Sequence, residues 1–302
     1  AKTPDENCAD LRTNGWELYL GWNDSFALMG KRFNYTVSAT LGDNKTVFTK
    51  FNNPEKNLSN HYEGKVLGEI WGYRVDGLFA SDEEAAEYTS KINQDAVNER
   101  ILTDKVDPYY RAGDLKFRDL DGDNVISKGD DTAYDAGDRE IIGNETPRYM
   151  YSFRLGADWN GFDLGIFFQG VGKRDWYPNY LSTGFWGPYS RAFTSFIPEN
   201  FMDQCWSEEN RDGYFPRFRG YQTFAGSQLG VNNDRYLQDA SYIRLKNLTV
   251  GYTLPVLKKV FTKLRVYFTG ENLWYWSPML KHTKYIDPEA AGGNGNTGMA
   301  YN

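Results

Sequence analysis

Alternating apolar and polar residues predict β-strands with two unlike faces. Between Arg148 and Trp159 the odd-numbered positions are apolar or aromatic, whereas the even-numbered positions include arginine, serine and aspartate. After Asn160-Gly161 the alternation resumes from Phe162 to Gln169. A period of two is typical of a strand, and Asn-Gly between two such runs is typical of a tight turn. The sequence therefore predicts an antiparallel hairpin over residues 148–169.

The same alternation recurs at residues 16–22, 33–41, 248–254 and 264–269. One face of each segment is apolar, with aromatic side chains near its ends, and the opposite face is largely polar. Such strands are typical of a transmembrane β-barrel, in which lipid covers one face and a wet lumen the other. The alternative is a soluble sandwich, whose apolar faces meet in a dry core. The aromatic share of 17% and the placement of the aromatic residues favour the barrel.

Two kinds of connection join the predicted strands. The short ones cover residues 24–31, 160–161 and 255–263, and the long ones cover residues 52–146, 172–238 and the segment after residue 276. This asymmetry is typical of outer-membrane barrels, whose long loops are extracellular. In the first long loop, Lys65–Phe79 predicts a short strand pair, and the capping box Ser81–Glu84 predicts a helix that continues to about Ile92.

Length and charge narrow the class of protein. No run within the 302 residues approaches the roughly 20 apolar residues that a membrane-spanning helix needs. The net charge of -7 argues against a nucleic-acid surface, which requires a basic stripe. The glycine-rich segment Gly292–Asn296 leaves the predicted strand Leu264–Tyr275 without a following partner, and an antiparallel barrel cannot close in this way. We therefore expect a piece of a longer protein that lacks residues on both sides.

An acidic segment in the first long loop has the spacing of a calcium-binding loop. Asn124 occupies the position at which the sharp turn favours glycine, but asparagine tolerates positive φ better than most residues. The sequence predicts a bound Ca2+ that holds the loop in shape, and an acidic turn without a metal is the alternative. The expected ligands, at EF-hand spacing, are Asp119, Asp121, Asp123, the backbone carbonyl of Val125, Ser127 and Asp130.

Candidate catalytic residues are few. His61 and His282, the only histidines, have no neighbouring cysteine, serine or acid at the spacing of a nucleophile or a metal site. A glycosidase remains an alternative, because the separation of two carboxylates is a three-dimensional fact. We expect no enzymatic activity. Cys8 and Cys205, the only cysteines, are either free thiols or a disulfide formed in an oxidising compartment.

Several stretches resemble one known family. Arg235–Pro255 and Leu264–Trp274 closely resemble the C-terminal barrel of SusC/RagA-type TonB-dependent transporters. The Asp119–Ile126 run also has a counterpart in that family. The resemblance covers nearly the whole chain in order. Four further stretches are similar to the same family: Gly15-Trp-Glu-Leu18, Gly68-Glu-Ile-Trp-Gly-Tyr73, Ile142-Gly-Asn-Glu-Thr-Pro-Arg-Tyr149 and Phe167-Phe-Gln-Gly-Val-Gly172.

The resemblance implies an antiparallel transmembrane β-barrel of the bacterial outer membrane, of the Bacteroides type. Residues 1–302 would supply about six of its 22 strands, and the plug domain and the closing strand would be absent. The resemblance further implies import of oligosaccharides, or in some cases peptides, with energy transmitted by TonB through the missing N-terminal part. A SusD-like surface lipoprotein would form a hinged lid over the extracellular mouth.

The second long loop is crowded with aromatic residues, which either pack within the loop or contact cargo. We expect Trp176, Trp186 and Tyr214 to contact an oligosaccharide or peptide, because aromatic rings stack on sugar faces and on peptide side chains alike. The alternative function is a calcium-binding extracellular adhesin or a carbohydrate-binding module, which would fold without detergent. The residues expected to line the hydrated lumen are Glu17, Asn34, Arg154, Asp163, Gln169 and Arg265.

Overall fold

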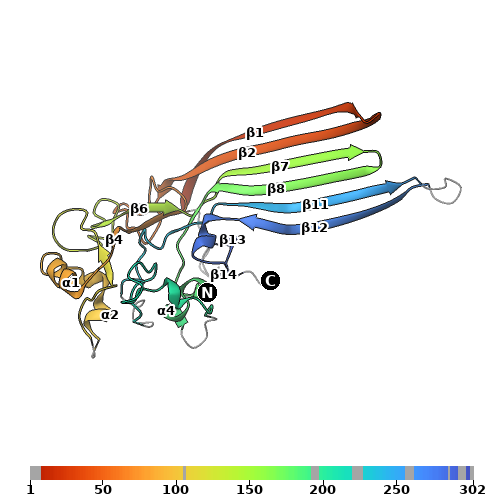
Figure 1. The fold of residues 1–302 in the computed structure, drawn as a ribbon. Coiled ribbons are helices and arrows are strands. Elements are labelled where there is room, and N and C mark those ends of the chain that lie inside the picture. Colours follow the sequence, from red (N-terminus) through yellow and green to blue (C-terminus); the bar gives the residue numbers. More distant parts are fainter. Residues whose placement is uncertain are drawn as a thin grey trace, which may run out of the picture.

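Six long strands form one antiparallel sheet in the computed structural model (Figure 1). The structure describes residues 8–104, 107–191, 197–219, 227–255, 262–284, 286–291 and 297–299. Each strand of the sheet pairs with its neighbours in the order β1-β2-β7-β8-β11-β12. The strands are β1 (Ala9–Leu28), β2 (Lys31–Phe51), β7 (Arg148–Trp159), β8 (Phe162–Lys173), β11 (Tyr242–Leu254) and β12 (Leu264–Trp276).

The register of the sheet places apolar and polar residues on opposite faces. One cross-strand row on the apolar face joins Trp22, Val37, Leu155, Ile166 and Leu248. The next row, on the opposite face, is small or polar and consists of Asn23, Thr36, Gly156, Gly165 and Thr249. This register confirms the two-faced sheet that the alternation predicts. Asp24 interrupts the apolar face of β1.

Side chains on the apolar face are exposed on the outer strands β1 and β12 and mostly half-buried on the strands between them. Leu20 is 62% exposed, Trp22 is 61% exposed and Phe268 is 60% exposed. A soluble sandwich would bury these side chains against a second sheet. The structure therefore favours the barrel interpretation over the sandwich.

Tight turns join the strands at one end of the sheet. Asn160 and Gly161 form the predicted turn between β7 and β8, both with positive φ (48° and 90°). The first turn differs from the prediction, because β1 and β2 continue to a two-residue turn at Met29-Gly30 instead of ending near residues 24 and 31. The third predicted turn, at residues 255–263, lies mainly outside the described residues.

The long connections gather at the opposite end of the sheet (Figure 1). We call residues 52–147, 174–241 and 277–299 the loop layer, and its first two parts the first and second long loops. Within the first loop, β3 (Glu69–Tyr73) pairs with β6 (Arg139–Asn144), and β4 (Val75–Leu78) pairs with β5 (Leu115–Phe117). The prediction that residues 65–79 form one strand pair is wrong, because a single residue between β3 and β4 leaves no room for a reversal.

Short helices and strands complete the loop layer. Helix α1 (Asp82–Thr89) begins at the predicted capping box, in which the Ser81 Oγ accepts a hydrogen bond from the Glu84 N–H at 3.1 Å. The helix ends three residues before the predicted Ile92. The other elements are η1 (Asp95–Val97), α2 (Glu99–Leu102), β9 (Asp175–Trp176), α3 (Thr183–Trp186), α4 (Pro188–Arg191), η2 (Met202–Gln204), β10 (Gln238–Asp239), η4 (Pro278–Lys281), β13 (Ile286–Ala291) and β14 (Thr297–Met299).

The hydrophobic core lies in the loop layer rather than in the sheet. Trp186, Tyr189 and Tyr236 have no exposed surface, and their rings pack around Phe215 with centroid separations of 5.8 to 6.1 Å. Residues of both long loops contribute to this core. The loop layer is therefore a packed unit, positioned at one end of a sheet whose own apolar side chains remain exposed.

Candidate functional site in the loop layer

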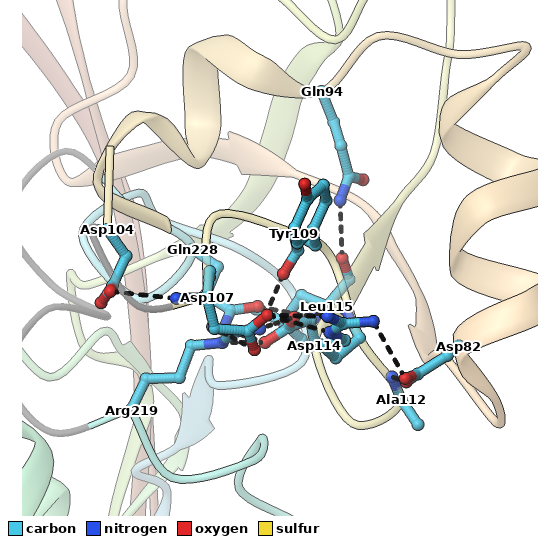
Figure 2. A network of polar contacts seen from close by, with 11 residues as sticks. Asp82, Gln94, Asp104, Asp107, Tyr109, Ala112, Asp114, Leu115, Arg219 and Gln228 are labelled. Carbon is cyan, nitrogen blue, oxygen red and sulfur yellow. Dashed lines mark hydrogen bonds and ion pairs between the residues drawn. The ribbon is translucent and has the colours of Figure 1, made fainter. Parts of the chain in front are cut away.

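A buried ion pair joins the two long loops (Figure 2). Asp114 of the first loop has no exposed surface, and Arg219 of the second loop is almost as deeply buried. The guanidinium donates two hydrogen bonds to the carboxylate, from Nε at 2.9 Å and from Nη2 at 2.8 Å. The Gln228 Nε2 donates a third hydrogen bond to this carboxylate at 3.2 Å. Arg219 and Gln228 thus place the second loop on Asp114.

Two glutamine side chains extend the network along β5 (Figure 2). The Gln228 Oε1 accepts a hydrogen bond from the Leu115 N–H at 2.6 Å, and the Gln94 Nε2 donates to the Leu115 carbonyl at 3.1 Å. The Gln94 Oε1 accepts from the Phe117 N–H at 3.3 Å. Side-chain amides therefore satisfy backbone groups of this short strand from both loops, as buried polar groups require.

Arg111 ties the start of α1 to the same network. Its guanidinium donates to Asp107 at 2.9 and 3.0 Å and to Asp82 at 3.2 Å. The Asp82 carboxylate also accepts the Ala112 N–H at 2.9 Å. The hydrogen bonds to Asp107 raise the pKa of Arg111 above its ordinary value. The network fixes the conformation of the first loop, and its charges are largely used in these internal contacts.

Three carboxylates of the first loop converge on one point. Asp119, Asp121 and Asp138 each place a carboxylate oxygen within 4.8 Å of the other two. Asp138 is buried, and its two oxygens accept the N–H groups of Leu120 and Ser127, each at 2.7 Å. Burial raises the pKa of Asp138, and the nearby charges of Asp121 and Asp119 add to this increase. Clustered hard oxygen donors of this kind suit a calcium ion.

The cluster differs from the predicted ligand set. Asp119 and Asp121 are common to both sets, whereas Asp123 lies outside the carboxylate cluster. Asp130 does not belong to the carboxylate cluster found in the described part of the chain either, and Asp138, which is not in the predicted set, completes that cluster. Asp138 follows Asp119 by 19 residues, so EF-hand spacing gave no signal for it.

Two of the three expected cargo contacts lie in the core. Trp186 has no exposed surface and Trp176 is 4% exposed. The Trp186 Nε1 donates to the carbonyls of Pro178 and Asn179, at 3.0 and 3.1 Å. In this conformation neither indole presents a face to a ligand, because each is covered by its own loop. Trp176 and Trp186 therefore pack within the loop, which was the alternative to contact with cargo.

Tyr214, the third expected contact, lines a polar pocket of about 470 Å³. Its ring stacks on His282, with centroids 3.6 Å apart and planes 11° from parallel. Burial raises the pKa of Tyr214 to about 12 and lowers the pKa of His282 to about 4. The pocket carries both signs of charge and is lined by Gly184, Pro198, Asn200, Phe201, Asp203, Gln204, Asn210, Asp212, Gly213, Tyr214, Lys281, His282 and Lys284.

Acidification is expected to weaken the loop layer through His282. Because the folded-state pKa is about 4, against an ordinary 6.5, the unfolded state binds more protons as the pH falls below 6.5. Allowing for partial exposure, we expect a loss of about 1 kcal/mol between pH 7 and pH 5. Thermal unfolding of the full-length protein at both pH values measures this loss. His282→Phe keeps the ring stack without titrating, so its pH dependence should be smaller; an unchanged dependence would assign the effect elsewhere.

The two histidines stack on aromatic rings, and the two cysteines do not pair. Cys8 is exposed, Cys205 is buried, and both are free thiols, so the disulfide alternative is not realised here. Burial raises the pKa of the Cys205 thiol. His61 stacks on Phe48 with ring centroids 4.2 Å apart, as His282 does on Tyr214.

Among the described residues, no helix is long and apolar enough to cross a membrane.

Comparisons with known proteins identify similar chains. No protein-family model matches the chain. TonB-dependent receptor P3 of Formosa agariphila is 27% identical over 96% of this chain and 26% of its own length. TonB-dependent receptor P26 of the same organism is 25% identical over 98% of this chain and 28% of its own length. The chain thus spans about a quarter of the curated relatives that it matches.

Solved structures share the fold. The structure of the RagAB peptide transporter matches 97% of this chain and 28% of the solved chain, with a TM-score of 0.58 and 21% sequence identity. The RagAB peptide importer in its closed-closed state gives a TM-score of 0.59 at 20% identity, over 97% of this chain and 28% of the solved chain. Both matches confirm that the chain has the fold of a portion of a transporter β-barrel. The sequence relatives confirm the resemblance to TonB-dependent transporters.

Proposed function

We propose that this chain, similar along most of its length to TonB-dependent receptors, forms part of an outer-membrane importer. The observation that carries the proposal is the two-faced sheet with exposed apolar side chains and tight turns at one end. Lipid would cover the apolar face, and the polar face would line the lumen. The loop layer would lie at the extracellular mouth. The chain would act in transport rather than in catalysis.

Residues on the polar face would form a hydrated wall around a plug supplied by the rest of the protein. Arg265 and Asp163 form an ion pair on this face, with Nη2 to Oδ1 at 2.5 Å, and Asn34 donates to Asp158 at 2.6 Å. Cross-strand contacts of this kind satisfy polar groups without lipid contact. Glu17, Arg154 and Gln169 share the same face by register.

The polar pocket around Tyr214 would contact cargo. It offers an aromatic edge, two carboxylates and two lysines, which suit the hydroxyl groups of an oligosaccharide or the backbone and termini of a peptide. The loop layer would also meet a SusD-like lipoprotein lid, and TonB would act through the N-terminal part. RagAB, a peptide transporter with a related fold, makes peptides as reasonable a cargo as glycans.

Calcium would hold the first loop through Asp119, Asp121 and Asp138. Their clustered oxygens supply hard ligands, and the bound ion would offset the repulsion among them. We expect Ca2+ to raise the melting temperature of the full-length protein, with about 2.7 kcal/mol of stabilisation at a concentration of 100 times the dissociation constant. Calorimetric titration of Asp138→Asn should show loss of binding, and Asp130→Asn should bind as the parent does. Loss of binding by Asp130→Asn but not by Asp138→Asn would favour the EF-hand ligand set. If titration of the parent protein with Ca2+ released or absorbed no heat, the segment would be an acidic turn without a metal.

Purification from outer membranes tests the transport function. The full-length protein is extracted in mild detergent, and mass spectrometry identifies what accompanies it. A co-purifying surface lipoprotein would support the importer, and glycans or peptides carried along would identify the cargo. Recovery of the protein alone, folded and in the soluble fraction, would instead favour a calcium-binding surface module.

A further inference from the structure

The apolar face of the sheet contains a depression at Ala157. By register, Ala157 lies between Tyr35 on β2 and Leu164 on β8, and the adjacent row toward the turns holds Trp159 and Phe162. Alanine is the smallest side chain in this neighbourhood, so the surrounding rings stand above it. Because the small side chain of Ala157 is surrounded by larger side chains on the same face, the sheet has a hollow at this position.

The hollow is a groove of about 640 Å³ whose lining is almost entirely apolar. It lies over β1, β2, β7, β8 and β11, so most of its floor belongs to strands that have partners on both sides. Its volume falls in the range of small-molecule sites. The side chains that shape it are Phe26, Phe33, Tyr35, Ala157, Trp159 and Phe162.

Trp159 is held in place at the rim of this groove. Its Nε1 donates a hydrogen bond to the Leu28 carbonyl at 3.2 Å, which ties the indole to the first hairpin. Phe26 and Phe33 pair across that hairpin with centroids 5.0 Å apart, and Phe162 packs on Tyr252 at 4.4 Å. Each of these rings therefore has a contact on a neighbouring strand.

A lysine lies beyond the rim on the same face. Phe33 pairs with Trp159 at the β7–β8 turn, and the first hairpin continues two residue pairs further to Lys31. Register places Lys31 on the face of Phe33, at the end of the sheet that carries the tight turns. Asp24 lies on this face at the height of the groove, four residues along β1 from Leu28, the partner of Lys31. Asp158 and Asp163 are the two acids among the lining residues, and register places their side chains on the opposite face. Lys31 thus lies one same-face position beyond Phe33, a lining residue of the groove. An apolar groove with a cation beyond its rim matches an acyl chain that ends at a phosphate.

We propose that this groove binds one acyl chain of an anionic phospholipid, with its phosphate at Lys31. The inference rests on the proposed function, because it requires lipid on the apolar face. The aromatic walls would contact the chain, and the lysine would select a net negative headgroup over a zwitterionic one. The site would be a specific position within the lipid shell rather than part of a uniform one.

Native mass spectrometry of the delipidated full-length protein tests the site. The protein is titrated in mild detergent with dioleoyl phosphatidylglycerol and, separately, with dioleoyl phosphatidylcholine. We expect one tightly retained phosphatidylglycerol. Ala157→Phe, which fills the groove, should weaken this binding about tenfold, as expected for the loss of about two methylene contacts. Lys31→Gln should lower the affinity for phosphatidylglycerol to that for phosphatidylcholine.

Ala39→Phe is the matched control, because Ala39 is on the same face between Leu20 and Phe153, away from the groove. It should bind lipid as the parent does. Equal binding by Ala157→Phe and Ala39→Phe, or equal affinity of the parent for both lipids, would overturn the inference. If the protein still fractionates with outer membranes, either result contradicts only the lipid site and not the proposed importer function. If the protein is absent from membranes, the importer function itself is contradicted.

Discussion

Arg219→Ala is expected to separate the two long loops and to destabilise the loop layer by about 3 to 5 kcal/mol. The substitution leaves the Asp114 carboxylate buried with only the Gln228 side chain and a backbone N–H as donors. A buried charge without its partner is far more costly than the loss of an exposed pair. Hydrogen exchange of the full-length protein should show faster exchange in both loops and unchanged exchange in the sheet.

Arg211→Ala is the control for this effect. Arg211 pairs with Glu208 at the surface, where both side chains are about 60% exposed. We expect less than about 1 kcal/mol of destabilisation, because solvent screens such pairs. If Arg219→Ala and Arg211→Ala had equal effects on exchange, the Asp114 network would not be what holds the loops together.

Val37→Arg is expected to destabilise the sheet by about 2 to 4 kcal/mol, provided that lipid covers the apolar face. Val37 lies within the part of β2 that pairs with β7, in the same row as Leu155, so its side chain would enter the hydrocarbon. A charge placed there loses hydration that the bilayer does not replace. Reversible folding of the full-length protein into lipid vesicles, followed in denaturant, measures the cost.

Thr36→Arg provides the matched comparison one residue away. Thr36 lies on the opposite face, beside Gly156, where the account places water. We expect a change within about 0.5 kcal/mol, as for substitutions away from the core. A larger penalty at Thr36 than at Val37 would reverse the assignment of the two faces.

The sheet was predictable because its signal is local. Alternation identifies the face of each residue from Arg148 to Trp159 and from Phe162 to Gln169, and Asn160-Gly161 supplies the positive φ that a two-residue turn needs. The first hairpin was predicted too short for a physical reason. Asp24 falls on the apolar face and breaks the alternation, and Met29-Gly30 is not a common turn pair, although its backbone adopts positive φ at both residues.

The loop layer was less predictable because its contacts join residues far apart in the sequence. Asn124 adopts the positive φ of 67° that the calcium-loop prediction requires, yet Asp138 reaches the carboxylate cluster only through the folding of the whole loop. Likewise, the sequence alone does not distinguish an aromatic loop residue that contacts cargo from one that packs in the core. Only the fold places Trp186 inside and leaves Tyr214 at a pocket.

Nitroxide scanning along β7 tests the central claim, that lipid and water lie on opposite faces of this sheet. Single cysteines replace residues 152–156 in turn in the full-length protein, with Cys8→Ser and Cys205→Ala removing the native thiols. Labelled sites are then exposed to oxygen, which concentrates in lipid, and to a water-soluble nickel complex. If lipid covers the apolar face, the ratio of oxygen to nickel accessibility should alternate with a period of two and be highest at positions 153 and 155. A ratio without alternation, or one that peaks at positions 152, 154 and 156, would contradict it.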